Sequence, residues 1–250
     1  ISNTLKDQGY YFSTVISSIQ DLGDNKIDLT YNINLGKRAK ISKISFIGDK
    51  KFKDNKLRRV IVSEEYKPWK FISGKKFLNE NLVDLDKRLL NNFYKNKGFY
   101  DVVIESSFAN YIGDDKFELI YNVLSGKKYY FNDLILKLPL DYDDSNFKEL
   151  RSMFADLKGQ SYSLNSIDDI LDTIDKIVLT EQYEFLKSSV KEETNGDLIN
   201  LTFNIDESEK FYVEKINFFG NNITQEDVLR NKLLTDEGDP FNQLLHAKSL

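Results

Sequence analysis

The sequence repeats one short stretch three times, as Leu29-Thr-Tyr-Asn-Ile33, Leu119-Ile-Tyr-Asn-Val123 and Leu201-Thr-Phe-Asn-Ile205. In each copy the first, third and fifth residues are apolar or aromatic, and the fourth is Asn. Alternation with a period of two is typical of a β-strand that has one buried face and one wetter face. The copies start 90 and 82 residues apart. This spacing indicates a repeat about the size of one small α+β unit.

A second strand is predicted before each copy, because a Ser-Ser pair and a turn signal precede the motif at matching distances. The turn signals are Gly23-Asp24-Asn25, Gly113-Asp114-Asp115 and Asn195-Gly196-Asp197. Gly, Asn and Asp tolerate the positive φ that a tight hairpin requires. The Ser-Ser strand is more polar and less regular than the motif strand, so we expect it at the edge of a sheet.

A third strand is predicted after the motif, and a change of period marks the helices. Lys43-Ile-Ser-Phe-Ile-Gly48 matches Lys215-Ile-Asn-Phe-Phe-Gly220, and residues 133–136 are a weaker copy. Apolar residues at helical spacing predict helices near 79–96 and 164–181. Each unit therefore reads strand, helix, helix, strand, strand. The expected fold class is α+β, as tandem β-α-α-β-β repeats, each with two helices on one face of a three-stranded sheet.

Composition excludes several classes of function. The net charge is -5, with charges of both signs, which argues against a nucleic-acid binder. There is no cysteine, so disulfides and thiolate metal sites are excluded. The one histidine, His246, has no acidic residue near it in sequence, and no phosphate-binding loop is found. No apolar run is long enough to span a bilayer. We expect no catalytic residues, no cofactor and no metal.

The order of elements, with a Gly-Tyr-type turn before the hairpin, resembles the POTRA domain. The motifs that carry the resemblance most closely are Phe211-Tyr-Val-Glu-Lys-Ile-Asn-Phe-Phe-Gly-Asn221, Val228-Leu-Arg-Asn231 and Tyr66-Lys-Pro-Trp-Lys70. Within that superfamily, four units in register are similar to the array of the BamA assembly factors. The resemblance implies the C-terminal part of one domain at 1–37, a third-like domain at 38–126, a fourth-like domain at 127–209 and the N-terminal part of a fifth-like domain at 210–250.

The resemblance also implies a function. It predicts a periplasmic scaffold at the outer membrane of a Gram-negative bacterium, which receives unfolded outer-membrane proteins, aids the insertion of β-barrel proteins and docks accessory lipoproteins. A membrane barrel is expected beyond Leu250, and no membrane span within the chain. Two alternatives remain open at this point. One is the POTRA array of a related translocation or secretion pore, and the other is an α+β enzyme.

Two sites are predicted. An edge strand exposes unpaired backbone groups, to which an extended client chain can add by β-augmentation. The expected client edge comprises Asp101, Val102, Val103, Ile104, Glu105, Ser106, Ser107 and Phe108. The resemblance implies lipoprotein docking at Arg230 and Glu237. These residues are seven apart, so they share one side if a helix runs that far, with Gly238 marking its end. An acid there would oppose the helix dipole, which suggests a role outside the domain.

Overall fold

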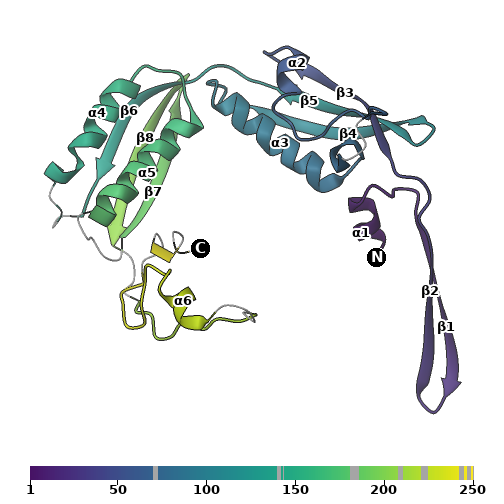
Figure 1. Cartoon of the computed structure of the whole chain (residues 1–250). Coiled ribbons are helices and arrows are strands. Elements are labelled where there is room, and N and C mark those ends of the chain that lie inside the picture. The colour runs from purple at the N-terminus through teal and green to yellow at the C-terminus, as the bar shows by residue number, and fades with distance from the viewer. Residues whose placement is uncertain are drawn as a thin grey trace. The chain divides into compact units, whose positions relative to one another are not determined.

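The computed structural model describes residues 1–69, 73–139, 142, 144–180, 186–207, 211–220, 225–241, 245–246 and 249. The chain divides into two compact units, Ile1–Lys128 and Tyr129–Leu250. Each unit contains one complete three-stranded sheet with its own helices (Figure 1).

The sheet of the first unit has the order β3-β5-β4. Its strands are β3 (Lys40–Asp49), β4 (Val103–Gly113) and β5 (Lys116–Leu124). The central strand β5, which carries the second copy of the motif, runs parallel to β3 and antiparallel to β4. The motif strand is central and the Ser-Ser strand is at the edge, as the sequence predicts.

Two helices accompany this sheet, the single turn α2 (Asp54–Leu57) and the long helix α3 (Glu80–Lys95), with the 3-10 turn η1 (Gly74–Lys76) between them. The side chain of Asn79 accepts a hydrogen bond from the amide of Leu82 and so caps the start of α3. The helix predicted near 79–96 is confirmed.

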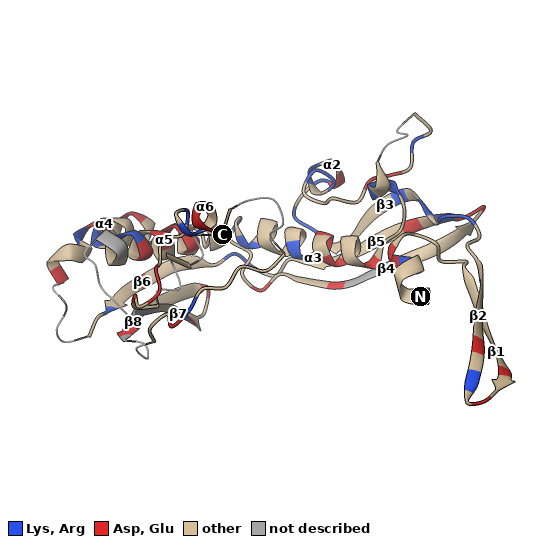
Figure 2. Ribbon diagram, turned by 60° about the horizontal axis from the view of Figure 1, so that its bottom comes forward, with Lys and Arg blue, Asp and Glu red and all other residues tan. Residues whose placement is uncertain are grey.

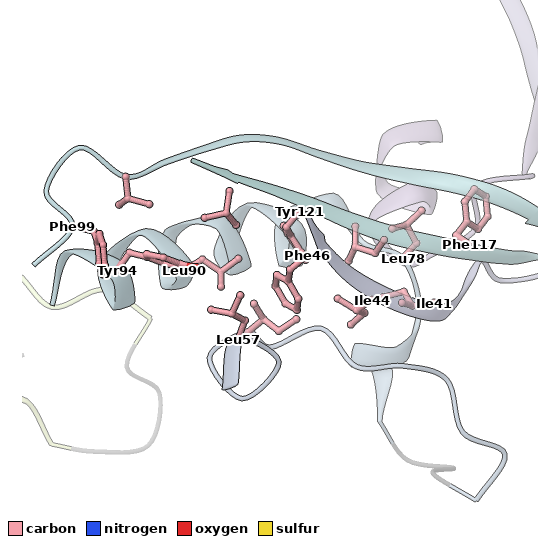
Figure 3. Close-up of a cluster of buried hydrophobic side chains, with 14 of the residues drawn as sticks. Ile41, Ile44, Phe46, Leu57, Leu78, Leu90, Tyr94, Phe99, Phe117 and Tyr121 are labelled. Carbon is pink, nitrogen blue, oxygen red and sulfur yellow. The ribbon is translucent and has the colours of Figure 1, made fainter. Parts of the chain in front are cut away.

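The core of this unit lies between α3 and the sheet (Figure 3). Leu119, Tyr121 and Val123, the alternate residues of the motif, are buried there. Tyr121 is joined in this core by Asp86 of α3, which is fully buried. The Asp86 carboxylate accepts hydrogen bonds from the Tyr121 hydroxyl at 2.6 Å and from the Val62 amide at 2.6 Å. A buried carboxylate thereby ties α3 to the central strand and to the loop after α2.

The second unit repeats this architecture with the order β6-β8-β7. It contains β6 (Tyr130–Lys137), η2 (Asp144–Phe147), α4 (Lys148–Leu157), α5 (Leu164–Thr180), β7 (Leu186–Asn195) and β8 (Leu198–Glu207). Helices α4 and α5 lie on one face of the sheet (Figure 1). The helix predicted near 164–181 is confirmed. The buried position of Tyr121 is taken by Phe203, and Ile170 of α5 stands where α3 has Asp86.

Two smaller elements complete the chain. In the first unit, α1 (Ser2–Asp7) precedes the hairpin of β1 (Thr14–Gly23) and β2 (Lys26–Asn34), which form a separate two-stranded sheet. In the second unit, the strand predicted at 215–220 is not formed: residues 211–220 contain no helix or strand, only an isolated β-bridge between Tyr212 and Pro240, and α6 (Glu226–Arg230) follows them. The φ angles of Asp24 and Asn25, and of Asp114 and Asp115, are positive, as the predicted hairpin turns require.

Candidate functional site

Strand β4 is the edge strand on which client pairing is predicted. It pairs with β5 on one side, and no other strand follows it in its sheet in the part of the chain described here. Its backbone groups on the outer side are therefore not used by the sheet. Val103 is 49% exposed, so the start of the strand is accessible.

The expected client edge is corrected at its start. Asp101 and Val102 precede β4, which begins at Val103, and Val102 is buried. A buried residue outside the strand cannot offer an edge. The pairing with β5 is also irregular between Ile104 and Ser106, so Glu105 lies at a bulge. Ser106, Ser107 and Phe108 belong to β4, but their side chains lie outside what the structure describes.

Arg230 and Glu237 form an ion pair, with Nη1 and Oε1 3.0 Å apart. Both side chains also bind the backbone of Ile216, in the segment 211–220 before α6. The Ile216 amide donates to Glu237 Oε1 at 2.9 Å, and Arg230 Nη2 donates to the Ile216 carbonyl at 2.8 Å. Together these contacts hold the loop after α6 against residues 211–220. We call the three residues the Arg230–Glu237 clamp.

This geometry corrects the helix argument made for Glu237. Helix α6 ends at Arg230, so it does not reach Glu237, and Gly238 lies in a later turn. Glu237 therefore does not oppose a helix dipole. Its hydrogen bond from Ile216 and its pairing with Arg230 hold the pKa of its carboxyl below the ordinary value. The residue has a local structural role that the sequence pattern did not reveal.

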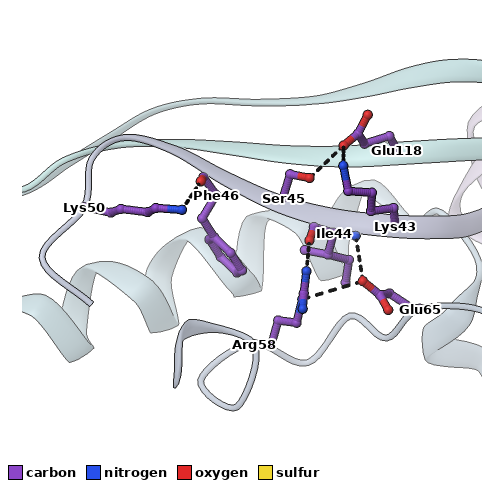
Figure 4. A network of polar contacts seen from close by, with 8 residues as sticks. All are labelled: Lys43, Ile44, Ser45, Phe46, Lys50, Arg58, Glu65 and Glu118. Carbon is purple, nitrogen blue, oxygen red and sulfur yellow. Dashed lines mark hydrogen bonds and ion pairs between the residues drawn. The ribbon is translucent and has the colours of Figure 1, made fainter. Parts of the chain in front are cut away.

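The first unit contains the same arrangement around Ile44 of β3 (Figure 4). The Ile44 amide donates to Glu65 Oε1 at 3.1 Å, and Arg58 Nη2 donates to the Ile44 carbonyl at 2.7 Å. Arg58 Nε lies 3.6 Å from Glu65 Oε1. These three residues form the Arg58–Glu65 clamp.

The two clamps are copies of one feature of the repeat, because Ile216, Arg230 and Glu237 each follow their counterpart by 172 residues. An ungapped comparison of 44–66 with 216–238 would have found Arg58 and Glu65 from the sequence. No such clamp is formed among the described residues of the repeat at 127–209. Seven residues after Arg151 stands Lys158, which pairs with Asp133 instead, with Nζ and Oδ1 2.8 Å apart.

On the sheet's other face, Glu118 of β5 joins the parallel strands of the first unit (Figure 4). Its Oε1 accepts hydrogen bonds from Lys43 Nζ at 2.8 Å and from Ser45 Oγ at 2.6 Å. Lys43, and after it Ser45, lower the pKa of the Glu118 carboxyl. On this face, Glu118 therefore links β5 to β3 through two polar contacts.

Figure 2 shows residues of both charge signs on the helices and the sheet of each unit. No helix in the described ranges combines the length and the apolar character needed to cross a bilayer. Within those same ranges no three side chains of His, Asp or Glu gather as metal ligands would. Asn221 and Lys70, which end two of the motifs quoted above, lie outside the described residues.

Comparison with known families assigns the chain. The family POTRA, described as surface antigen variable number repeat, matches residues 39–126 and 211–249, which together are half of the chain. The chain belongs to the POTRA family. Both clamps lie within these POTRA matches. The match over 39–126 coincides with the sheet β3-β5-β4 and its helices.

Curated relatives of this POTRA array include several proteins called outer membrane protein assembly factor BamA. The protein from Buchnera aphidicola subsp. Acyrthosiphon pisum is 26% identical over 231 residues, which cover 89% of this chain and 36% of the relative. The one from Neisseria meningitidis serogroup B is 23% identical over 231 residues, covering 91% of this chain and 29% of the relative. The chain thus spans about a third of the length of these curated relatives.

A solved structure shows the same fold. The crystal structure of Haemophilus influenzae BamA POTRA3-5 matches with a TM-score of 0.60 at 17% sequence identity. The match covers 84% of this chain and 83% of that chain. At this low sequence identity, the structural similarity supports the α+β POTRA fold and does not by itself support a shared function.

Proposed function

We propose that this POTRA array is a periplasmic, polypeptide-binding scaffold that serves the assembly and insertion of β-barrel proteins into the outer membrane, and that it binds without catalysing. The relatives named as outer membrane protein assembly factors support this proposal. The proposal includes the division of the chain into repeats at 1–37, 38–126, 127–209 and 210–250. The observation that carries it is the edge strand β4, which has a free outer side.

We propose that unfolded outer-membrane proteins add to β4 as an extra strand. Backbone pairing is indifferent to most side chains, which suits a receptor for many β-rich clients. Because Glu105 lies at a bulge, the pairing should involve Val103 and Ile104 before it and Ser106 to Phe108 after it. A bulge on an edge also discourages pairing between copies of the protein. The client would then bind reversibly.

Site-specific photo-cross-linking tests this pairing. A photoreactive residue at Val103 should capture an extended peptide from an outer-membrane β-barrel protein, whereas one at Ile47 of β3, on the opposite edge, should not. Val103→Pro should weaken binding, because proline lacks the N–H donor. Circular dichroism checks that this variant keeps its fold. Equal capture from both edges, or unchanged binding to a folded Val103→Pro chain, would remove β4 as the client site.

We further propose that an accessory lipoprotein docks on the surface around Arg230 and Glu237. The side chains are 34% and 40% exposed, so a partner can reach them. Glu237 uses Oε1 for both of its contacts in the clamp, and Oε2 has no partner in the described part of the chain. The guanidinium of Arg230 donates hydrogen bonds to the side chains of Glu226 and Glu237 and to the Ile216 carbonyl. Oε2 is therefore the group that faces the partner, and the partner should offer a Lys or Arg there.

The test separates docking from folding by using the second clamp. In the full-length protein, Glu237→Lys should weaken lipoprotein binding in a salt-dependent way, and so should Arg230→Glu, which misplaces Glu237. Glu65→Lys makes the same change in the other clamp and should leave that affinity unchanged. If neither Glu237→Lys nor Arg230→Glu lowers the affinity, docking lies elsewhere. Equal losses from Glu65→Lys and Glu237→Lys would also contradict a direct contact.

A further inference from the structure

A hollow opens in the first unit where α1 approaches the start of α3. Its volume is about 510 Å³. It is lined by residues from four segments, namely Asp7, Gln8, Tyr10, Arg38, Gly74, Lys75, Asn79 and Leu82. Two hydrogen bonds join three of these segments, since the Ala39 amide donates to the Gly9 carbonyl at 2.8 Å and the side-chain Nδ2 of Asn79 donates to the Asp7 carbonyl. The hollow is thus built by the fold before any ligand arrives.

Arg38 is the fixed element of this hollow. Its Nε donates to the Gln8 carbonyl at 3.0 Å. Its guanidinium carbon lies 3.8 Å from the ring centre of Phe77 and 5.6 Å from that of Tyr10. Stacking on aromatic rings and one anchored nitrogen hold the planar group in one orientation. The two terminal nitrogens bond to no protein group in the described ranges.

This lack of a partner distinguishes Arg38 from the arginines of the clamps. Arg58 lies against Glu65, and Arg230 against Glu237. An arginine with a fixed orientation and free terminal N–H groups matches the geometry of a carboxylate, which it binds through two parallel hydrogen bonds. The absence of an internal carboxylate leaves that capacity for a ligand.

The other lining groups favour a ligand with a single negative charge. Lys75 is exposed and has no acidic partner in the described part of the chain, so it supplies a second cation. Asp7 supplies the one carboxylate among the lining residues. Two cations and one anion leave a single net positive charge, which suits a carboxylate better than a doubly charged phosphate.

We propose that this hollow binds a carboxylate of an extended peptide, either an Asp or Glu side chain or the carboxylate at a chain's C-terminus. Arg38 holds the carboxylate with its two terminal nitrogens, and Lys75 adds attraction from the rim. Asp7 limits the affinity through like-charge repulsion. The inference does not depend on client pairing at β4, since no residue of β4 lines the hollow.

Titration of the full chain with short labelled peptides tests the proposal. One arm compares peptides that contain Asp or Glu with the matching Asn or Gln peptides. A second arm compares a free C-terminus with an amidated one. The amide signals of Gly74 and Lys75 in NMR spectra report binding at the hollow. We expect binding to require a carboxylate in at least one arm, and that arm identifies its source.

Variants locate the contact. Arg38→Gln should weaken binding about tenfold, and Arg38→Lys less, because a lysine keeps the charge but loses the planar fork. Lys75→Gln should weaken it about threefold, and Asp7→Asn should tighten it by a similar factor. Arg88→Gln, on the exposed side of α3, is the matched control and should change nothing.

Three results would overturn the proposal. One is equal binding of the acidic and the amide peptides. Another is binding of inorganic phosphate with none of any peptide carboxylate. The third is unchanged peptide affinity in Lys75→Gln together with unchanged affinity in a folded Arg38→Gln chain. Because the side chain of Lys75 is exposed and forms no ion pair or hydrogen bond in the described fold, its variant keeps the test valid even if loss of Arg38 destabilises the junction.

Discussion

Glu237 and Arg230 hold the two ends of one residue, since Glu237 accepts from the amide of Ile216 while Arg230 donates to its carbonyl. Glu65 and Arg58, 172 residues earlier, bind the amide and the carbonyl of Ile44 in the same way. Because both the N–H and the C=O of this residue are hydrogen-bonded to the clamp, the residue cannot shift in position relative to the two side chains. The clamp therefore fixes β3 against the loop after α2 in the first unit, and residues 211–220 against the loop after α6 in the second.

Loss of the Arg58–Glu65 clamp should lower the stability of the first unit. Each of Arg58→Gln and Glu65→Gln should cost about 1 kcal/mol of unfolding free energy, since charge-assisted bonds to backbone are worth more than that when buried, and partial exposure weakens them. The double variant should cost less than the sum, as expected for coupled residues. Urea denaturation measures all three. Arg59→Gln, next in sequence and exposed, is the control, and a similar loss there would contradict the clamp.

The Arg230–Glu237 clamp should open in acid. The pKa of Glu237 is lowered by the Ile216 amide and then by Arg230, so the carboxylate stabilises the folded form. For a group whose folded pKa is lowered, that stabilisation is present above the ordinary value of 4.5 and is lost as the pH falls through the folded pKa. The NMR shift of the Ile216 amide should follow this titration below pH 4.5. Arg230→Gln should move the midpoint upward, and a midpoint that stays in place would be inconsistent with the pairing.

Removing the Tyr121 hydroxyl should destabilise the first unit. Burial, and after it the charge and hydrogen bond of Asp86, raise the pKa of Tyr121, so the hydroxyl stays protonated and donates. Tyr121→Phe leaves one oxygen of a buried carboxylate without its donor, which should cost about 1–2 kcal/mol. Thermal or urea unfolding measures the change.

Tyr94 provides the control for this prediction. Its hydroxyl is buried near the backbone of Lys51 but has no hydrogen-bond partner among the residues that the structure describes. Tyr94→Phe should therefore change stability by less than about 0.5 kcal/mol. Equal losses of unfolding free energy in Tyr94→Phe and Tyr121→Phe would show that the hydrogen bond to Asp86 does not stabilise the fold.

Gly48→Ala should be among the most damaging single changes in the first unit. Gly48 has φ +86°, and an added Cβ would lie 2.5 Å from the Val123 carbonyl oxygen on the neighbouring strand. Gly113 has φ +95° but open space around it, so Gly113→Ala incurs only backbone strain, about 1–2 kcal/mol. Gly48→Ala adds a clash with backbone and should cost at least about 3 kcal/mol. Unfolding curves of the two variants measure the difference, and equal losses would mean that β3 and β5 part easily.

The repeat made much of the fold predictable. Two-residue alternation around Tyr121 and Phe203 identified the central strands, and the apolar spacing around Leu82 and Ile174 identified the long helices. These patterns report which side of an element is buried, and they depend only on nearby residues. Glu237 shows where such reasoning failed, because its partners at Ile216 and Arg230 are brought to it by the fold of the loop.

The sequence by itself determined the element order of the two complete repeats, the hairpin turns and the family, because each follows from local periodicity, from residues that tolerate positive φ and from motifs in a repeated register. Only the tertiary structure decided which side chains meet. Nothing local marks Asp86 as the partner of Tyr121, 35 residues further along the chain, yet the packing of α3 on β5 brings the two side chains together in the core. A pattern states which face is apolar, whereas burial and pairing depend on what packs against that face from distant parts of the chain.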